Sequence, residues 1–110
     1  MAATTENNEP SGAEKMFGDF APGLVHFTDN VLFGDAWKRP QLSPRDRSLI
    51  TVAALTAGGN ADQLTFHLQY AKDNGASEEE LIEAITRLTY AGWPKAFSAM
   101  AVAKQVFRTS

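Results

Sequence analysis

The sequence predicts an all-α fold, and three observations support this class. Apolar residues recur at three- and four-residue intervals in several segments. Helix-starting pairs such as Ser43-Pro44 and helix-ending residues such as Gly75 bound those segments. No stretch alternates apolar and polar residues for long enough to indicate a strand. We therefore expect a compact domain of about five to six helices over residues 15–110, after a polar, disordered tail over residues 1–14.

The first predicted helix carries one apolar stripe. Pro22 suits a first helical turn, so the continuous helix is expected to begin near Ala21 and to stop near Gly34. The stripe consists of Phe17, Phe20, Leu24, Phe27 and Val31.

The second predicted helix starts at Ser43, whose side chain can cap it. Pro44 fits the first position, and Asp46 stands where a capping-box acid would reach back. The helix runs to Gly58-Gly59 and is apolar round most of its surface, which predicts a central helix that is buried on most sides.

The third predicted helix begins at Asn60, with Gln63 three residues on as in a capping box. Asn74-Gly75 ends it with a left-handed cap. This helix carries His67 in its middle.

Two further helices complete the prediction. Ser77 and the acids that follow it open the fourth helix, because negative charge is favourable at a helix start. Its expected buried face is Leu81, Ile82, Ile85 and Leu88. After a break at Tyr90–Pro94, the last helix presents small residues on one side, which let another helix approach closely; these are Ala96, Ala99 and Ala103.

Composition excludes several classes of function. A net charge of −3 and the lack of a basic run argue against binding to a nucleic-acid backbone. The absence of cysteine excludes thiol redox chemistry, disulfides and cysteine-ligated zinc. His26 and His67 are too far apart for a local metal motif, and no apolar run approaches the ~20 residues of a membrane span. We expect a cytoplasmic protein without a signal peptide, a metal or a membrane partner.

Two groups of residues could carry chemistry. Gln63, His67 and Tyr70 follow one line of the third helix beside its apolar stripe, which suits either a solvated face or a proton donor at a site. Arg39, Arg45 and Arg47 lie around the start of the second helix, where they could attract a carboxylate. The alternative is that Arg39 and Arg45 are exposed while Arg47 pairs with Asp46 or with another acid. Trp37 and Trp93 suit packing next to chain breaks, and His26 suits the surface.

The chain resembles the carboxymuconolactone decarboxylase family, within the wider alkylhydroperoxidase D-like group. The resemblance is carried by Trp37-x-Arg39-Pro40-x-Leu42, Arg47-Ser-Leu-Ile-Thr-Val-Ala53, Phe66-His67-Leu68, Asn74-Gly75 and Tyr90-Ala-Gly-x-Pro94-x-Ala96. Redox members of the group have two cysteines where this chain has Asn60 and Gln63, and a glutamate where it has Ser48. Thiol peroxidase activity is therefore not expected. The family's N-terminal Val-Leu-Gly block with its following histidine is not found before Phe33.

The resemblance implies a lyase that needs no cofactor. The family's namesake reaction removes CO2 from 4-carboxymuconolactone, in the breakdown of aromatic acids, and the electrons flow through a C=C bond into the lactone carbonyl. By this resemblance, His67 is the proton donor, and Arg47 and Gln63 are further catalytic residues. The substrate-binding residues are Arg39, Arg45, Trp37 and Tyr90. A homotrimer or homohexamer is also implied. The alternatives are a non-catalytic oligomer that binds a small organic acid, or a lyase or isomerase with another substrate.

Overall fold

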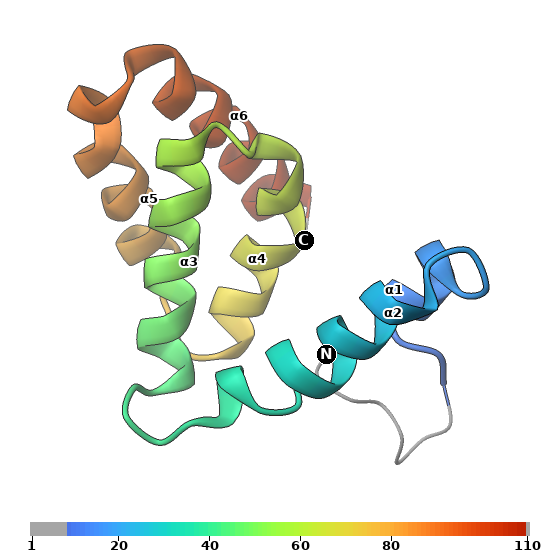
Figure 1. Cartoon of the computed structure of the whole chain (residues 1–110). Helices are drawn as coiled ribbons and strands as arrows, with labels where there is room; N and C mark the ends of the chain where they lie inside the picture. Colours follow the sequence, from blue (N-terminus) through green and yellow to red (C-terminus); the bar gives the residue numbers. More distant parts are fainter. Residues whose placement is uncertain (1–8, 110) are drawn as a thin grey trace. The chain divides into compact units, whose positions relative to one another are not determined.

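The computed structural model describes residues 9–109, so residues 1–8 of the expected tail lie outside the described part (Figure 1). Within that part every regular element is helical, which confirms the all-α class. The chain divides into two compact units, Met1–Leu42 and Ser43–Ser110. The α-helices are α1 (Gly12–Phe17), α2 (Pro22–His26), α3 (Pro44–Gly58), α4 (Ala61–Asp73), α5 (Glu78–Arg87) and α6 (Trp93–Thr109). The other helical turns are the π-helix η2 (Phe27–Leu32) and the 3-10 helices η3 (Ala36–Lys38) and η4 (Leu88–Ala91).

In the first unit, α1 begins inside the segment that the sequence predicts to be a tail. Ser11 forms a capping box: its hydroxyl accepts the Glu14 N–H at 3.1 Å, and its own N–H donates to the Glu14 carboxylate at 3.0 Å. The Ser11 hydroxyl also donates to Asp29 Oδ2 at 2.6 Å, which ties α1 to η2. These contacts give the short α1 an ordered start.

The predicted first long helix is interrupted. Pro22 does occupy the first turn of α2, as expected. The winding then widens at Phe27, and the Phe33 N–H reaches back five residues to the Thr28 carbonyl. The apolar stripe faces solvent along much of its length, with Phe20 91% exposed.

The second unit consists of α3, α4, α5 and α6 with η4. Figure 1 shows α3 and α4 side by side as an antiparallel pair joined by a short turn at Gly59. α4 also packs against α6, and α5 packs against both α3 and α6. Their facing sides enclose the hydrophobic core, which is Val52, Leu64, Leu68, Ala71, Ala76, Leu81, Ile85, Ala99 and Ala103.

Helix α3 is less buried than the sequence predicts. Its start is as expected, because the Ser43 hydroxyl accepts the Asp46 N–H at 3.1 Å. The Asp46 carboxylate does not complete a capping box and instead binds Arg45. The expectation that α3 is buried on most sides is wrong: Ile50 on its outer side is 56% exposed. The other helices of the unit cover one side of α3, and its remaining apolar surface stays open.

Helix α4 ends as predicted but begins differently. Gly75 has a φ of 106°, the left-handed conformation expected after Asn74. Asn60 is the N-cap residue, yet its side chain makes no capping hydrogen bond, so the expected capping box with Gln63 is wrong.

Helices α5 and α6 follow the predicted pattern closely. Ser77 and Glu80 form a complete capping box, with both hydrogen bonds at 3.0 Å. Of the residues predicted for the buried face of α5, only Ile82 is exposed, with 42% of its surface accessible. The predicted alanine side of α6 is buried. None of the helices within residues 9–109 is both long enough and apolar enough to cross a membrane.

Candidate active site

His67 lies in the middle of α4, at the edge of that helix's buried side. Leu64, Leu68 and Ala71 form this side and are buried in the core between α3 and α6. His67 follows Leu64 by three residues and directly precedes Leu68, so its imidazole lies next to the core. The residue is half-buried. Its Nδ1 atom is shielded from solvent. The histidine is therefore neither a fully solvated surface residue nor a core residue.

Burial lowers the pKa of His67 below its usual range, because desolvation disfavours the charged imidazolium. An unperturbed imidazole titrates near neutrality, which is what makes His67 a candidate proton donor from the sequence. The structure shifts this group further toward the neutral form at neutral pH. A ligand that carries negative charge would shift it back, since an opposite charge close by favours the imidazolium.

Two aromatic rings of the same helix flank the imidazole. The Phe66 ring meets His67 edge-on with 4.9 Å between centroids, and the Tyr70 ring lies 6.4 Å from it. Phe66 and Tyr70 stack on each other at 5.3 Å. Phe66 is not among the predicted site residues, although its position beside His67 in the sequence is a signal for it. The rings give His67 an apolar wall on one side.

Arg45 and Arg47 both lie in α3, the helix that packs against the helix of His67. Arg47 lies in the first turns of α3, is half-buried, and has its Nε shielded from solvent. The next residue, Ser48, is buried and accepts a hydrogen bond from the Asn74 side chain at 3.0 Å. Asn74 follows His67 by seven residues, about 10 Å along the helix axis. Arg47 therefore lies near the level of the C-terminal end of α4, about two helical turns from His67.

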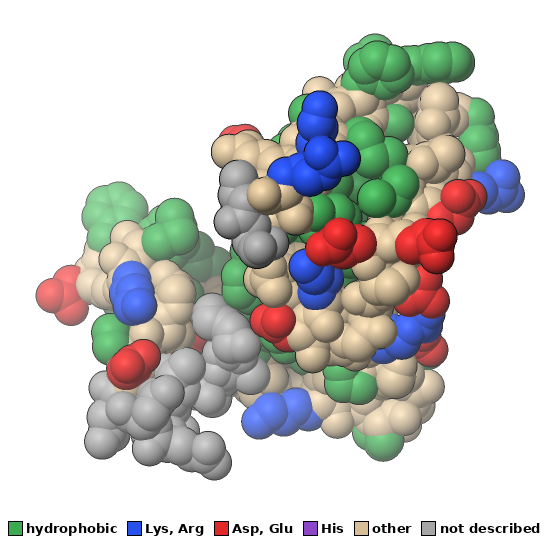
Figure 2. Space-filling view, turned by 180° about the vertical axis from the view of Figure 1, so that it is seen from behind, with side chains coloured by type: hydrophobic (Ala, Val, Ile, Leu, Met, Phe, Trp, Pro, Cys, Tyr) green, Lys and Arg blue, Asp and Glu red, His purple; other side chains and the backbone are tan. Residues whose placement is uncertain are grey.

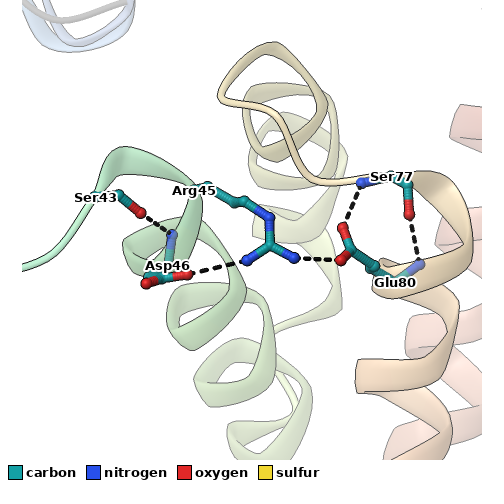
Figure 3. A network of polar contacts seen from close by, with 5 residues as sticks. All are labelled: Ser43, Arg45, Asp46, Ser77 and Glu80. Carbon is teal, nitrogen blue, oxygen red and sulfur yellow. Dashed lines mark hydrogen bonds and ion pairs between the residues drawn. The ribbon is translucent and has the colours of Figure 1, made fainter.

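Arg45 is held by two acidic side chains (Figure 3). Its guanidinium donates to Asp46 at 3.0 Å and also pairs with Glu80 of α5. The hydrogen bond from the Ser77 backbone lowers the pKa of Glu80, and Arg45 lowers it further. A substrate carboxylate would have to compete with both acids for Arg45. Asp46, the first partner that the alternative interpretation named for Arg47, therefore binds Arg45.

The other predicted site residues are placed as follows. Gln63 lies one turn before His67 on α4 and is exposed. Tyr90, in η4, is 75% exposed, and the Arg87 guanidinium lies 5.0 Å from its ring centre. Trp37 and Arg39 belong to the first unit, where the Trp37 ring stacks on Phe33 at 6.0 Å and Arg39 is exposed after η3. Hence the α3–α4 pair carries four of the predicted site residues, namely Arg45, Arg47, Gln63 and His67. Trp37 and Arg39 belong to the other unit.

His26 serves as a comparison for His67. It is exposed at the end of α2, and its Nδ1 lies 3.1 Å from the side-chain nitrogen of Asn30. This agrees with the expected surface position. Between residues 9 and 109, no three histidine or acidic side chains come together to form a metal site.

The all-α fold agrees with the family that the sequence resembles, and comparison with known proteins shows that family. Residues 22–105 match the carboxymuconolactone decarboxylase family, so the chain belongs to this family of decarboxylases.

Two characterised relatives are similar to this chain. A 4-carboxymuconolactone decarboxylase of Acinetobacter baylyi is 38% identical over 91 residues, which cover 82% of this chain and 68% of that protein. A nitrosuccinic acid decarboxylase of Metarhizium robertsii is 32% identical over 74 residues, 66% of this chain and 52% of that protein. The chain therefore spans about two thirds of the first relative and about half of the second.

Proposed function

We propose that this chain is a cofactor-independent lyase that decarboxylates a small organic acid, with 4-carboxymuconolactone as the first candidate substrate. The names of the two relatives support a common class of substrate. In the carboxylated lactone, the electrons left by CO2 flow through a C=C bond into the lactone carbonyl. In a nitro acid they flow into the nitro group. Either acceptor stabilises the carbanion within the substrate itself.

The position of His67 at the edge of the core carries this proposal, because decarboxylation must end with a proton placed on carbon. In the proposed reaction, the bond between the substrate carbon and its carboxyl group breaks and CO2 leaves. The electron pair of that bond forms a dienolate. Protonated His67 then gives its proton to carbon and becomes neutral, and water restores the proton.

The lowered pKa of His67 fits this sequence of events if the substrate brings negative charge. Before binding, the imidazole is held toward its neutral form. A bound carboxylate would raise the pKa and draw a proton onto the ring. The donor would then be charged when the substrate is in place.

Arg47 is our preferred group for binding the carboxylate that remains on the substrate, because it is half-buried on the helix beside α4. Arg45 is a weaker candidate, since Asp46 and Glu80 already hold it. The substrate-binding roles of Arg39 and Trp37 remain predictions from the sequence. It also remains a prediction that Gln63 or Tyr90 orients His67 or the lactone.

The test is proton NMR of the purified protein with freshly generated 4-carboxymuconolactone, and separately with nitrosuccinate. We expect the decarboxylated product to form faster than in buffer with at least one of them. The His67→Ala variant should lose about 10²–10⁴-fold in rate, the range typical of a positioned general acid. The matched control is His26→Ala, which removes an exposed histidine and should keep the wild-type rate.

The outcomes separate the parts of the proposal. A His67→Ala variant as fast as wild type would remove the proton-donor role and leave the decarboxylase in place. Saturating shifts of substrate resonances without product, for both acids, would favour the alternative of a non-catalytic binding protein.

A further inference from the structure

The outer side of α6 carries a line of side chains whose character changes along the helix. Its N-terminal half has two aromatic residues, with Trp93 63% and Phe97 67% exposed. Its C-terminal half has two cations, Lys104 and Arg108, which are also exposed. The α6 stripe, as we name it, consists of Trp93, Phe97, Met100, Ala101, Lys104 and Arg108.

The exposed members of the stripe lie away from the side by which α6 enters the core, and Met100 at its edge packs partly against the core. Successive members are one, three or four residues apart, so they share one side of the helix. The buried alanines Ala96, Ala99 and Ala103 fall on the other side. Large aromatic side chains that are exposed together on one side of a helix are a common feature of protein–protein contacts.

The spacing of the stripe is symmetric about the point between Met100 and Ala101. Trp93 and Arg108 stand equally far from that point, and so do Phe97 and Lys104. Aromatic residues on one side of the point thus match cations on the other. A second α6 lying antiparallel, with a two-fold axis through this point, would place each aromatic ring opposite a cation.

We propose that two copies of this chain associate through the α6 stripe in this antiparallel, two-fold arrangement. Trp93 then lies over Arg108 of the second copy, and Phe97 lies over its Lys104. Cations are attracted to the faces of aromatic rings, and the attraction grows as water leaves the contact. Ala101 at the centre has a small side chain, which lets the two helices approach closely, and Met100 fills the adjoining space.

An apolar groove lies beside the stripe. This groove of about 540 Å³ lies between α5 and α6 and is lined mainly by apolar atoms, including those of Ile85, Phe97 and Met100. Lys104 stands at the same groove. Figure 2, seen from the side of α6, shows hydrophobic side chains gathered on this unit with Lys and Arg side chains next to them. A stripe that carries both partners of each contact favours a second copy of this chain as the occupant.

This contact also distinguishes between the two oligomers that the family resemblance implies. A two-fold contact has a place in a hexamer with dihedral symmetry, where it joins two rings of three. A ring of three alone contains no two-fold contact.

Analytical ultracentrifugation over a range of concentrations tests the proposal. Phe97→Lys would set like charges opposite each other across the two-fold axis, so we expect the dissociation constant of the two-fold contact to rise about tenfold or more. The double variant Phe97→Lys with Lys104→Phe restores an aromatic ring opposite a cation on both sides. It should return the dissociation constant to within about threefold of wild type.

Two results would overturn the proposal: a wild-type protein that stays monomeric or forms only trimers, or a Phe97→Lys variant that associates as tightly as wild type. Failure of the double variant to recover would also count against the antiparallel register. Phe20→Lys is the matched control, because Phe20 is an exposed aromatic residue outside the stripe. Circular dichroism checks that each variant folds, and none of these measurements depends on catalysis.

Discussion

The two units of the chain contain similar helical patterns of apolar residues, but the apolar side chains are buried in one unit and largely exposed in the other. In the second unit, four helices face one another and bury residues such as Leu68 and Ile85 completely. In the described part of the first unit, Phe33 is the buried large side chain, while Leu24 and Phe27 are 51% and 62% exposed. Periodicity tells which residues share a side of a helix. Whether that side is covered depends on other helices.

The two histidines differ in the same way. His26 belongs to a short helix with an open surface, and a neighbouring asparagine side chain meets its ring. His67 belongs to a helix whose neighbours close over one side, and its pKa is lowered. The difference between a surface histidine and a candidate proton donor comes from the packing of the unit around it.

The largest expected effect separates the two units by stability. Leu68→Ala should lower the free energy of unfolding by about 2–5 kcal/mol, because it leaves a cavity in the core. Leu24→Ala, the same change at a half-exposed position of the first unit, should change it by less than about 0.5 kcal/mol. Urea unfolding followed by circular dichroism at one protein concentration measures both. Equal losses would mean that Leu24 is covered in solution.

A smaller effect is expected at the two serine caps. Ser77→Ala removes the cap of α5 and should cost about 1 kcal/mol in the urea unfolding of the second unit. Ser11→Ala removes the equivalent cap of α1 and should leave that transition in place, while amide exchange in α1 becomes faster. The comparison fails if Ser11→Ala shifts the main transition as much as Ser77→Ala does.

The smallest effect concerns the pH dependence given by His67. Its folded-state pKa is lowered, so below about pH 6.5 the unfolded chain binds a proton that the folded chain refuses. Stability therefore falls as pH drops from about 6.5 toward the lowered pKa. The His67→Gln variant should lose this part of the slope in a series of melting temperatures from pH 7.5 to 5. A wild-type slope that the variant retains in full would assign the pH dependence to other groups.

Much of the fold could be predicted from local signals. The caps at Ser43 and Ser77, the left-handed Gly75 and the buried alanines of α6 all follow from residues that act within one or two turns. The exposure of Ile50 could not be read in this way, because it depends on which helices cover α3. The π-helical winding that begins at Phe27 could not be predicted either, because the apolar stripe fits an ordinary α-helix equally well.

The sequence indicates candidate residues for the site, but it does not indicate their burial or their ion pairs. The sequence indicated His67 and Arg47, and the structure places both on neighbouring helices. It did not indicate the pairing of Arg45 with Glu80, since these residues are far apart in the chain and meet only when α3 packs against α5. Nor did it indicate the shift in the pKa of His67, which results from tertiary burial.

The contact between Arg45 and Glu80 has a consequence for how this sequence can change over generations. One oxygen of Glu80 accepts the Ser77 N–H in the α5 cap, and the other accepts Arg45 from α3 (Figure 3). Glutamine at position 80 can keep the first contact but loses the charge that holds Arg45. Aspartate keeps the charge on a shorter side chain. Substitution at this position is therefore more restricted than at Glu79, a neighbouring exposed acid of the same helix, and drift at 45 and 80 should occur as paired changes.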